Sequence, residues 1–171
     1  MAKLDAYLTR KAQVVAERQA GWTASPESAL LTLKASSKVA GITGARPIQM
    51  GEHKVLSDSA TGLAGHALGP TAPELLLGAL ASCLVHTYLI QAALMNIALD
   101  DVQVEVTGRL DMAGAVAIEG AALPLISPIS YQAHIEADAT PAQIQAMHDA
   151  VETGCPVLLT LRQPVQVSRI P

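Results

Sequence analysis

The stretch from Ala72 to Leu99 constrains the fold more than any other part of the sequence. It carries no formal charge after Glu74, and it contains Cys83, the first of only two cysteines. Thr71 and Glu74 fit a capping box, in which Thr71 is the N-cap and Glu74 is the third helical residue. The sequence therefore predicts a long, buried central helix, unbroken or divided into two.

A membrane span is the rival interpretation, because about 20 apolar residues suffice to cross a bilayer. The acidic residues Glu74, Asp100 and Asp101 flank the stretch, where lysine, arginine or aromatic anchors are typical of a membrane helix. Polar residues also interrupt it, among them His86, Thr87, Gln91 and Asn96. The sequence favours the core helix of a soluble protein with no membrane partner.

Composition limits the class of protein further. With 171 residues, 50% of them hydrophobic and 15% charged, the chain is predicted to be one folded domain over 1–171, with 1–22 as an N-terminal helical extension. This high apolar content also predicts that a partner covers part of the surface, and hence that the chain forms an oligomer. A net charge of −4, no basic cluster and no phenylalanine argue against nucleic-acid binding.

Hydrophobic periodicity predicts an α+β fold, with strands before and after the central helix. Helices are expected over 3–19, 141–154 and 156–161. The bend 44–47 is expected to present Arg46. Strands are expected over 29–36, 53–56, 102–107, 129–135 and 165–169, and residues 39–43 either continue the first strand or pair with it.

The two cysteines are the only reactive constellation in the sequence. Cys155 is predicted at a helix start, where free N–H groups stabilise a thiolate. Cys83 and Cys155 are 72 positions apart, so their pairing cannot be derived from sequence. No cofactor motif is present, and the scattered histidines and cysteines do not have zinc-ligand spacing. The N-terminus lacks an apolar signal region, which predicts a reducing, cytoplasmic location.

Two motifs carry a resemblance to a known family. Pro-Glu-Leu-Leu-Leu-Gly-Ala-Leu-Ala-Ser-Cys ends at Cys83, and Gly-Cys-Pro-Val begins at Gly154. Together, and in this order, they resemble the OsmC/Ohr family (osmotically induced protein C and organic hydroperoxide resistance protein). The resemblance spans roughly 31–170. It implies an OsmC-like fold, with antiparallel strands flanking a long, cysteine-bearing helix, in an intertwined homodimer.

The resemblance also implies a reaction that uses no metal or organic cofactor. Cys83 would be the peroxidatic cysteine, Cys155 would resolve the sulfenic acid as a disulfide, and an external thiol would reduce that disulfide. Family members also use an arginine that stabilises the thiolate and a glutamate that orients the arginine. Arg46 is the candidate arginine, with Arg109 and Arg162 as rivals.

Glu74 departs from the family pattern. The family glutamate precedes the cysteine by ten positions, whereas Glu74 precedes Cys83 by nine. Nine positions put two side chains on opposite faces of a helix at about 100° per residue. Glu74 is therefore either a helix cap or the residue that orients the arginine.

Three functional hypotheses follow. The first is reduction of organic hydroperoxides, and the second is binding of an apolar small molecule or redox sensing without turnover. The third is hydrolysis by a thiol with His86 as base, and it ranks last because it lacks an orienting acid. His86, and His66 before the helix, are each either site residues or structural ones.

Overall fold

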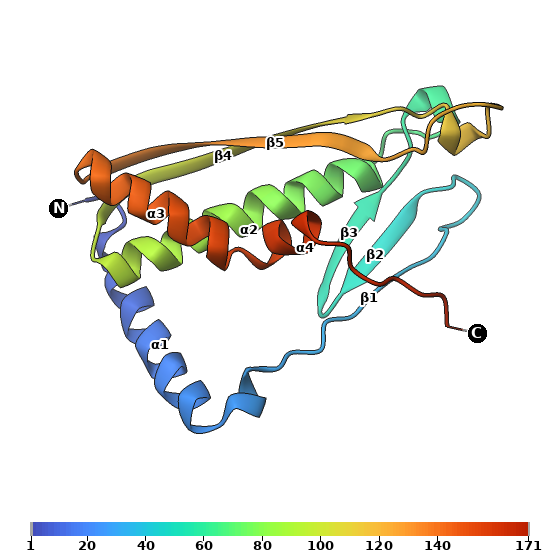
Figure 1. Cartoon of the computed structure of the whole chain (residues 1–171). Helices are drawn as coiled ribbons and strands as arrows, with labels where there is room; N and C mark the ends of the chain where they lie inside the picture. The colour runs from blue at the N-terminus through green and yellow to red at the C-terminus, as the bar shows by residue number, and fades with distance from the viewer. Residues whose placement is uncertain (1, 171) are drawn as a thin grey trace. The chain divides into compact units, whose positions relative to one another are not determined.

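The computed structural model describes residues 2–170, which form two compact units, 2–20 with 78–170 and 21–77. The helices and strands of the chain are coloured in sequence order in Figure 1. Their bounds are α1 Asp5–Ala24, β1 Ala35–Ser37, β2 Arg46–Met50, β3 His53–Ser57, α2 Ala72–Met95, β4 Ala98–Leu110, β5 Ile126–Asp138, α3 Pro141–Gly154 and α4 Pro156–Arg162, with 3-10 turns η1 Pro26–Ala29, η2 Thr61–Leu63 and η3 Gly114–Val116.

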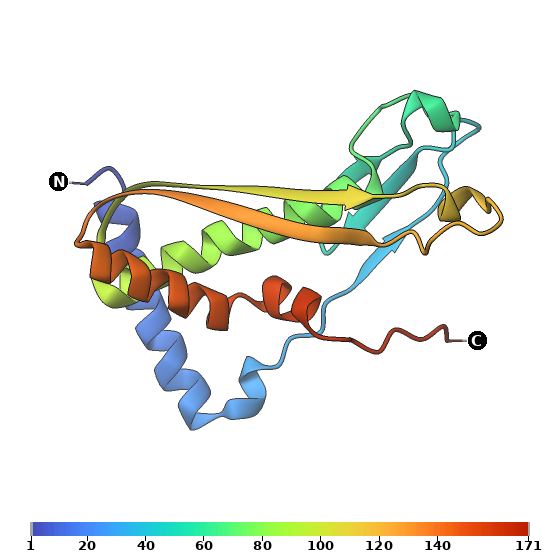
Figure 2. The same ribbon diagram turned by 45° about the horizontal axis from the view of Figure 1, so that its top comes forward.

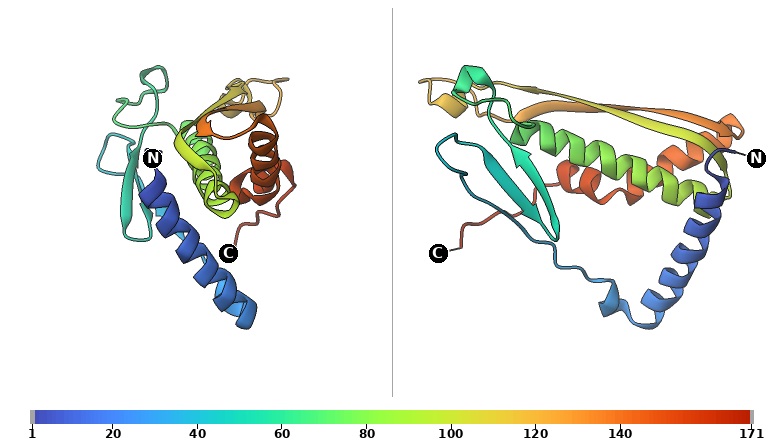
Figure 3. Two further views of the ribbon diagram at one scale, coloured as in Figure 1. Left: turned by 90° about the vertical axis from the view of Figure 1, so that its left-hand side faces the viewer. Right: turned by 180° about the vertical axis from the view of Figure 1, so that it is seen from behind.

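The larger unit is built on an antiparallel ribbon of β4 and β5, two strands of 13 residues each. Figure 2 shows the two strands side by side along their whole length. Alternate residues of the ribbon pack on the core, as in the opposed pairs Val104↔Ala133 and Val106↔Tyr131. Helices α2, α3 and α4 lie against this face, as the end-on view in Figure 3 shows.

Helix α2 is continuous over 24 residues, so the predicted central helix is confirmed and is not divided. Its core face is a row spaced by four residues, Leu80, Leu84, Tyr88 and Ala92, none more than 1% exposed. This spacing places the row on one side of a helix. The row packs with Met147 and Val151 of α3 and with Leu99 of β4 in one buried cluster.

Helix α1 joins the same cluster through its first turns. Leu8 is buried there, and the backbone N–H of Leu4 donates to Leu99 O at 3.3 Å. The helix was expected over 3–19, but it runs through Gly21 to Ala24. A helical glycine costs about 1 kcal/mol relative to alanine, which the neighbouring helical residues outweigh here.

The smaller unit contains a sheet in the order β1-β2-β3. The predicted strand at 53–56 is confirmed as β3, but Arg46 and Pro47 begin β2 rather than a bend. The predicted strand over 29–36 is reduced to β1, because only Ala35 to Ser37 meet a partner, β2, whereas Leu31 and Leu33 lie exposed outside any strand. Residues 39–43 form no strand.

The predicted strands over 102–107 and 129–135 are confirmed and extended as β4 and β5, and α3 and α4 are confirmed. The predicted closing strand over 165–169 is wrong. These residues form no helix or strand, and Val167 is 89% exposed. Alternation alone predicts a strand, but a strand also needs a neighbour that pairs with its backbone.

Candidate functional site

The fold brings Cys83 and Cys155 together. Cys83 lies in the middle of α2, in a row with Thr87 and Gln91 that flanks the core row. Cys155 is fully buried at the junction between α3 and α4, and its side chain interacts with that of Cys83. Both are free thiols.

Gly154 allows this junction to approach α2 closely. A Cβ atom at Gly154 would lie 3.5 Å from Gln91 Nε2 and 3.7 Å from Thr87 Cγ2, which is already van der Waals contact. A larger side chain would push Cys155 away from Cys83. Close packing against α2 therefore explains why the first residue of the Gly-Cys-Pro-Val motif is glycine.

Cys155 is the single non-helical residue between two helices. Its φ and ψ are −82° and 111°, and it is both the C-cap of α3 and the N-cap of α4. Pro156 follows at the first position of α4, where its missing N–H costs no helical hydrogen bond. The backbone N–H of Val157, the next residue, is directed to the Cys83 thiol.

Burial raises the pKa of the Cys83 thiol above its ordinary value, and Cys155 beside it adds to the rise. The Val157 N–H and the Thr87 hydroxyl act in the opposite direction by hydrogen bonding. None of these groups is a cation. Their sum favours the thiol over the thiolate, which is the reactive form.

Arg46 stands at the start of β2, next to a tight turn. Gly44 takes a positive φ of 77° there. The Arg46 Nη1 atom donates to Gly44 O at 3.0 Å and to Ser59 Oγ at 3.3 Å. The guanidinium group is thus tied to the loop that follows β3.

Asp58 organises that loop, and sequence reasoning missed it. Its side chain is 1% exposed, and its carboxylate accepts the backbone N–H groups of Ser59, His66 and Leu68 at 2.8, 2.9 and 3.2 Å. The Ser59 bond is the main cause of a lowered Asp58 pKa. A lone aspartate before a glycine-rich loop is the only sequence signal that could have revealed this role.

Glu74 forms the predicted capping box with Thr71. Its Oε2 atom accepts from the Thr71 backbone N–H at 2.7 Å and from the Thr71 hydroxyl at 2.8 Å. Thr71 Oγ1 in turn accepts the Glu74 backbone N–H at 3.4 Å. These bonds lower the pKa of Glu74, and its role in orienting an arginine stays a prediction.

The two histidines have structural partners. His86 Nε2 lies 2.8 Å from Lys11 Nζ of α1, and burial followed by the Lys11 charge lowers the His86 pKa. Because an ammonium group only donates, His86 Nε2 is the acceptor in this contact. His66 contributes its backbone N–H to Asp58.

The rival arginines differ in their surroundings. Arg109 is exposed on β4. Arg162, at the end of α4, forms an ion pair with Glu152 of α3, with Nη2 and Oε2 3.1 Å apart. Tyr131 of β5 donates its hydroxyl to the other carboxylate oxygen of Glu152 at 3.0 Å.

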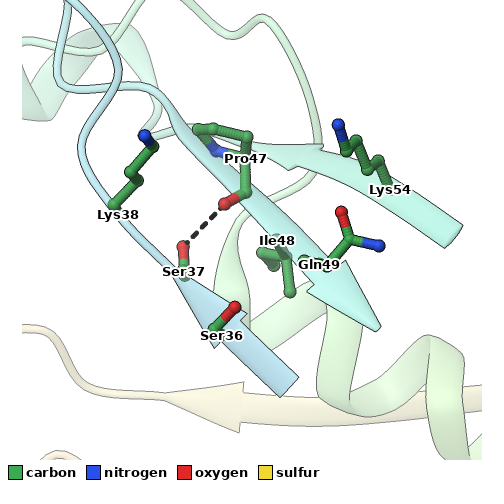
Figure 4. A pocket seen from close by; sticks show the side chains of 7 residues that line it. All are labelled: Ser36, Ser37, Lys38, Pro47, Ile48, Gln49 and Lys54. Atoms are coloured by element: carbon green, nitrogen blue, oxygen red, sulfur yellow. Dashed lines mark hydrogen bonds between the residues drawn. The ribbon is translucent and has the colours of Figure 1, made fainter. Parts of the chain in front are cut away.

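A cavity of about 370 Å³ lies on the β1-β2-β3 sheet (Figure 4), and neither cysteine lines it. Ser37 Oγ donates to Pro47 O across it at 3.2 Å. Its lining residues are Ser36, Ser37, Lys38, Pro47, Ile48, Gln49 and Lys54. Among residues 2–170, no group of three or more His, Cys, Asp or Glu side chains is placed to hold a metal ion.

Comparisons with known proteins identify the family. Residues 65–169 match the model of the OsmC-like protein family. An OsmC-like protein from Mycoplasma pneumoniae aligns with a TM-score of 0.66 and 17% identity over 77% of this chain and 88% of its own. An OsmC-like protein of unknown function from Vibrio cholerae aligns with a TM-score of 0.62 and 13% identity over 77% and 94%.

An organic hydroperoxide resistance protein, OsmC, from Legionella pneumophila also aligns, with a TM-score of 0.57 and 20% identity over 78% of this chain and 91% of its own. No curated protein sequence matches the chain. The chain belongs to the OsmC family and has its mixed α+β fold, with antiparallel strands and a long central helix. Helix α2 is apolar and long enough to cross a membrane by length and composition, and here it is that central helix.

The Asp58 loop generates a prediction about acid stability. Because the folded-state pKa of Asp58 lies below its ordinary value of 3.8, its stabilisation is complete above that value and is lost as the pH falls through the lower, folded pKa. Urea unfolding of wild-type protein should therefore show a loss of stability from about pH 5 to about pH 2 that is smaller in Asp58→Asn. The variant should already be less stable at neutral pH, since an amide N–H₂ faces backbone donors.

Asp138→Asn, which removes an exposed carboxylate at the end of β5, is the matched control and should keep the wild-type pH dependence. Equal acid dependence in Asp58→Asn and wild type would contradict the role assigned to Asp58.

Proposed function

We propose that this chain reduces organic hydroperoxides with a pair of thiols, Cys83 as the peroxidatic and Cys155 as the resolving cysteine. The observation that carries the proposal is the contact between the two free thiols, which lie 72 positions apart in sequence. The family of the chain, and the resistance to organic hydroperoxides named for its Legionella relative, support the same reaction.

The proposed cycle has three steps. The Cys83 thiolate attacks the hydroxyl oxygen of the hydroperoxide, the O–O bond breaks, and the alkoxide takes up the proton that the Cys83 thiol released and leaves as an alcohol. Cys83 is then a sulfenic acid. The Cys155 sulfur attacks the Cys83 sulfur, the S–O bond breaks, and hydroxide leaves with the Cys155 proton as water. An external dithiol reduces the disulfide and is itself oxidised to a disulfide.

Arg46 has a defined part in this proposal. Since burial raises the pKa of Cys83 and no cation among the groups that set it opposes the rise, the reaction needs a positive charge at the sulfur. A guanidinium group is always protonated and carries several fixed donors. We therefore assign thiolate stabilisation to Arg46, which Ser59 and Gly44 hold in place.

A second copy of the chain is the proposed partner. Only 28% of the most apolar window of α2 is buried within one chain. Large apolar side chains are also exposed outside the helices and strands, among them Leu33, Ile42, Val167 and Ile170. An interface between two copies, of the intertwined kind that the resemblance implies, would cover such surface.

Binding of an apolar ligand without turnover is the second candidate function. The raised pKa of Cys83 favours it, because a thiol that stays protonated reacts slowly with peroxides. A reducing, cytoplasmic compartment suits either function, since both cysteines are free.

Thiol titration tests the proposal directly. One equivalent of cumene hydroperoxide should remove both thiols of the wild-type protein, and dithiothreitol should restore them. Cys83→Ser should not react, whereas Cys155→Ser should lose its remaining thiol and then overoxidise, because its sulfenic acid has no resolving partner. Thiols that persist in excess peroxide would leave the ligand-binding function as the account of this site.

Glu74→Gln separates the two roles of Glu74. Glutamine also serves in a capping box, so we expect the variant to keep its stability and its peroxide rate within about twofold, whereas Glu74→Ala should lose about 1 kcal/mol of stability. Stopped-flow oxidation and urea unfolding measure the two effects. A Glu74→Gln rate that falls as far as that of Arg46→Ala would show that the carboxylate orients the arginine.

The dimer is tested by light scattering coupled to size-exclusion chromatography. The proposal predicts a mass twice that of the 17.7-kDa chain. Ile42→Asp and Val167→Asp, which place charges on exposed apolar positions, should shift the mass toward one chain. A monomeric wild type at micromolar concentration would contradict the proposed partner.

A further inference from the structure

We infer that Glu152 is a positioning residue for the Cys83–Cys155 pair. Its carboxylate links strand β5 to helix α4 across the helix break that holds Cys155. The inference rests on the proposed function in treating the two thiols as a reacting pair, and it adds a residue that sequence reasoning did not single out.

Each carboxylate oxygen of Glu152 has its own partner. Tyr131 Oη of β5 donates to Oε1 at 3.0 Å, and Arg162 Nη2 of α4 donates to Oε2 at 3.1 Å. Glu152 lies three residues before Cys155 in the last turn of α3, and Arg162 lies seven residues after it at the end of α4. Both helices that meet at Cys155 are therefore tied to one carboxylate.

Tyr131 lies close to the Cys155 thiol as well as to Glu152. Burial raises the pKa of Tyr131 to about 12, with further contributions from the Glu152 hydrogen bond and from Cys155. The phenol therefore remains protonated, and so remains a donor to Glu152, at any pH at which the thiols are studied. Its ring packs against the buried core, which makes β5 a firm anchor for the link.

The helix break needs such a link because it has only one residue. Two helices joined by one extended residue can change their angle by rotation about its φ and ψ. Rotation at Cys155 would move its sulfur and would also move the Val157 N–H, which hydrogen-bonds to the Cys83 thiol. Glu152 restrains this rotation from outside the backbone.

The link through Glu152 should have a moderate effect on how well the two thiols are aligned. The side chains of Arg162 and Glu152 are 46% and 48% exposed, and an exposed ion pair contributes little by itself. The hydrogen bond from the half-buried Tyr131 to a charged acceptor is stronger. Together the two interactions should raise the equilibrium constant for forming the Cys83–Cys155 disulfide by about tenfold.

Equilibration with glutathione measures this alignment without peroxide. Glutathione disulfide and the two protein thiols exchange to give the Cys83–Cys155 disulfide and two molecules of glutathione. The equilibrium constant is the effective concentration of one thiol at the other. We expect this equilibrium constant to fall about tenfold in Glu152→Gln, in which an N–H₂ group replaces one of the two accepting oxygens, and by a similar or smaller factor in Tyr131→Phe.

Glu136→Gln is the matched control, because it makes the same change at an exposed position on β5 and should keep the wild-type constant. The equilibrium constant of the double variant Tyr131→Phe/Glu152→Gln should be no lower than that of Glu152→Gln alone, since both changes break the same link. If Glu152→Gln does not fold, as judged by circular dichroism, then Tyr131→Phe alone decides, because it removes a single oxygen atom.

A wild-type constant in the folded Glu152→Gln or Tyr131→Phe protein would overturn the inference. This outcome is distinct from failure of the proposed function. A wild-type protein that ignores cumene hydroperoxide, but whose glutathione equilibrium still shifts in Glu152→Gln, would refute the peroxidase and retain the positioning role.

Discussion

Close packing between α2 and the α3–α4 junction is the constraint on which the larger unit depends. The row Leu80, Leu84 and Tyr88 fixes α2 against the β4–β5 ribbon and α3. The neighbouring row that contains Cys83 and Thr87 then has to face the junction. Because residue 154 is glycine, the junction can come within contact distance of that row. The meeting of Cys83 with Cys155 is thus a consequence of how the core packs.

The same packing makes the Cys83 thiol harder to deprotonate. The partial burial of Cys83 raises the pKa of its thiol, and the Val157 N–H and Thr87 hydroxyl offset only part of that rise. A half-buried thiol beside a buried one is well placed to form a disulfide but poorly placed to form a thiolate. In our account, Arg46 supplies the charge that the surroundings of Cys83 lack, while Glu152 keeps the second thiol aligned.

Sequence patterns predicted the parts of this structure that rest on local rules. The capping box at Thr71, the helix predicted over 141–154 and the alternation that predicts the strands over 102–107 and 129–135 each correspond to an observed element. Patterns failed where an element depends on a distant partner. Residues 31–34 and 165–169 alternate as strands do, yet within one chain they have no strand to pair with.

The site divides in the same way. The motifs around Cys83 and Cys155 identified the two thiols through a family resemblance, but their contact depends on the tertiary fold. Asp58 and Glu152 were missed because their partners are backbone N–H groups of a loop and side chains on other elements. No spacing along the chain marks such residues.

Peptide mapping of the oxidised protein tests the central claim most directly. Wild-type protein treated with one equivalent of cumene hydroperoxide, alkylated and digested without reductant, is analysed by tandem mass spectrometry. Our account predicts one dominant cross-linked peptide that joins Cys83 to Cys155, absent from untreated protein and from Cys83→Ser. Cysteines that remain alkylated, or that link only Cys83 to Cys83 between chains, would contradict it.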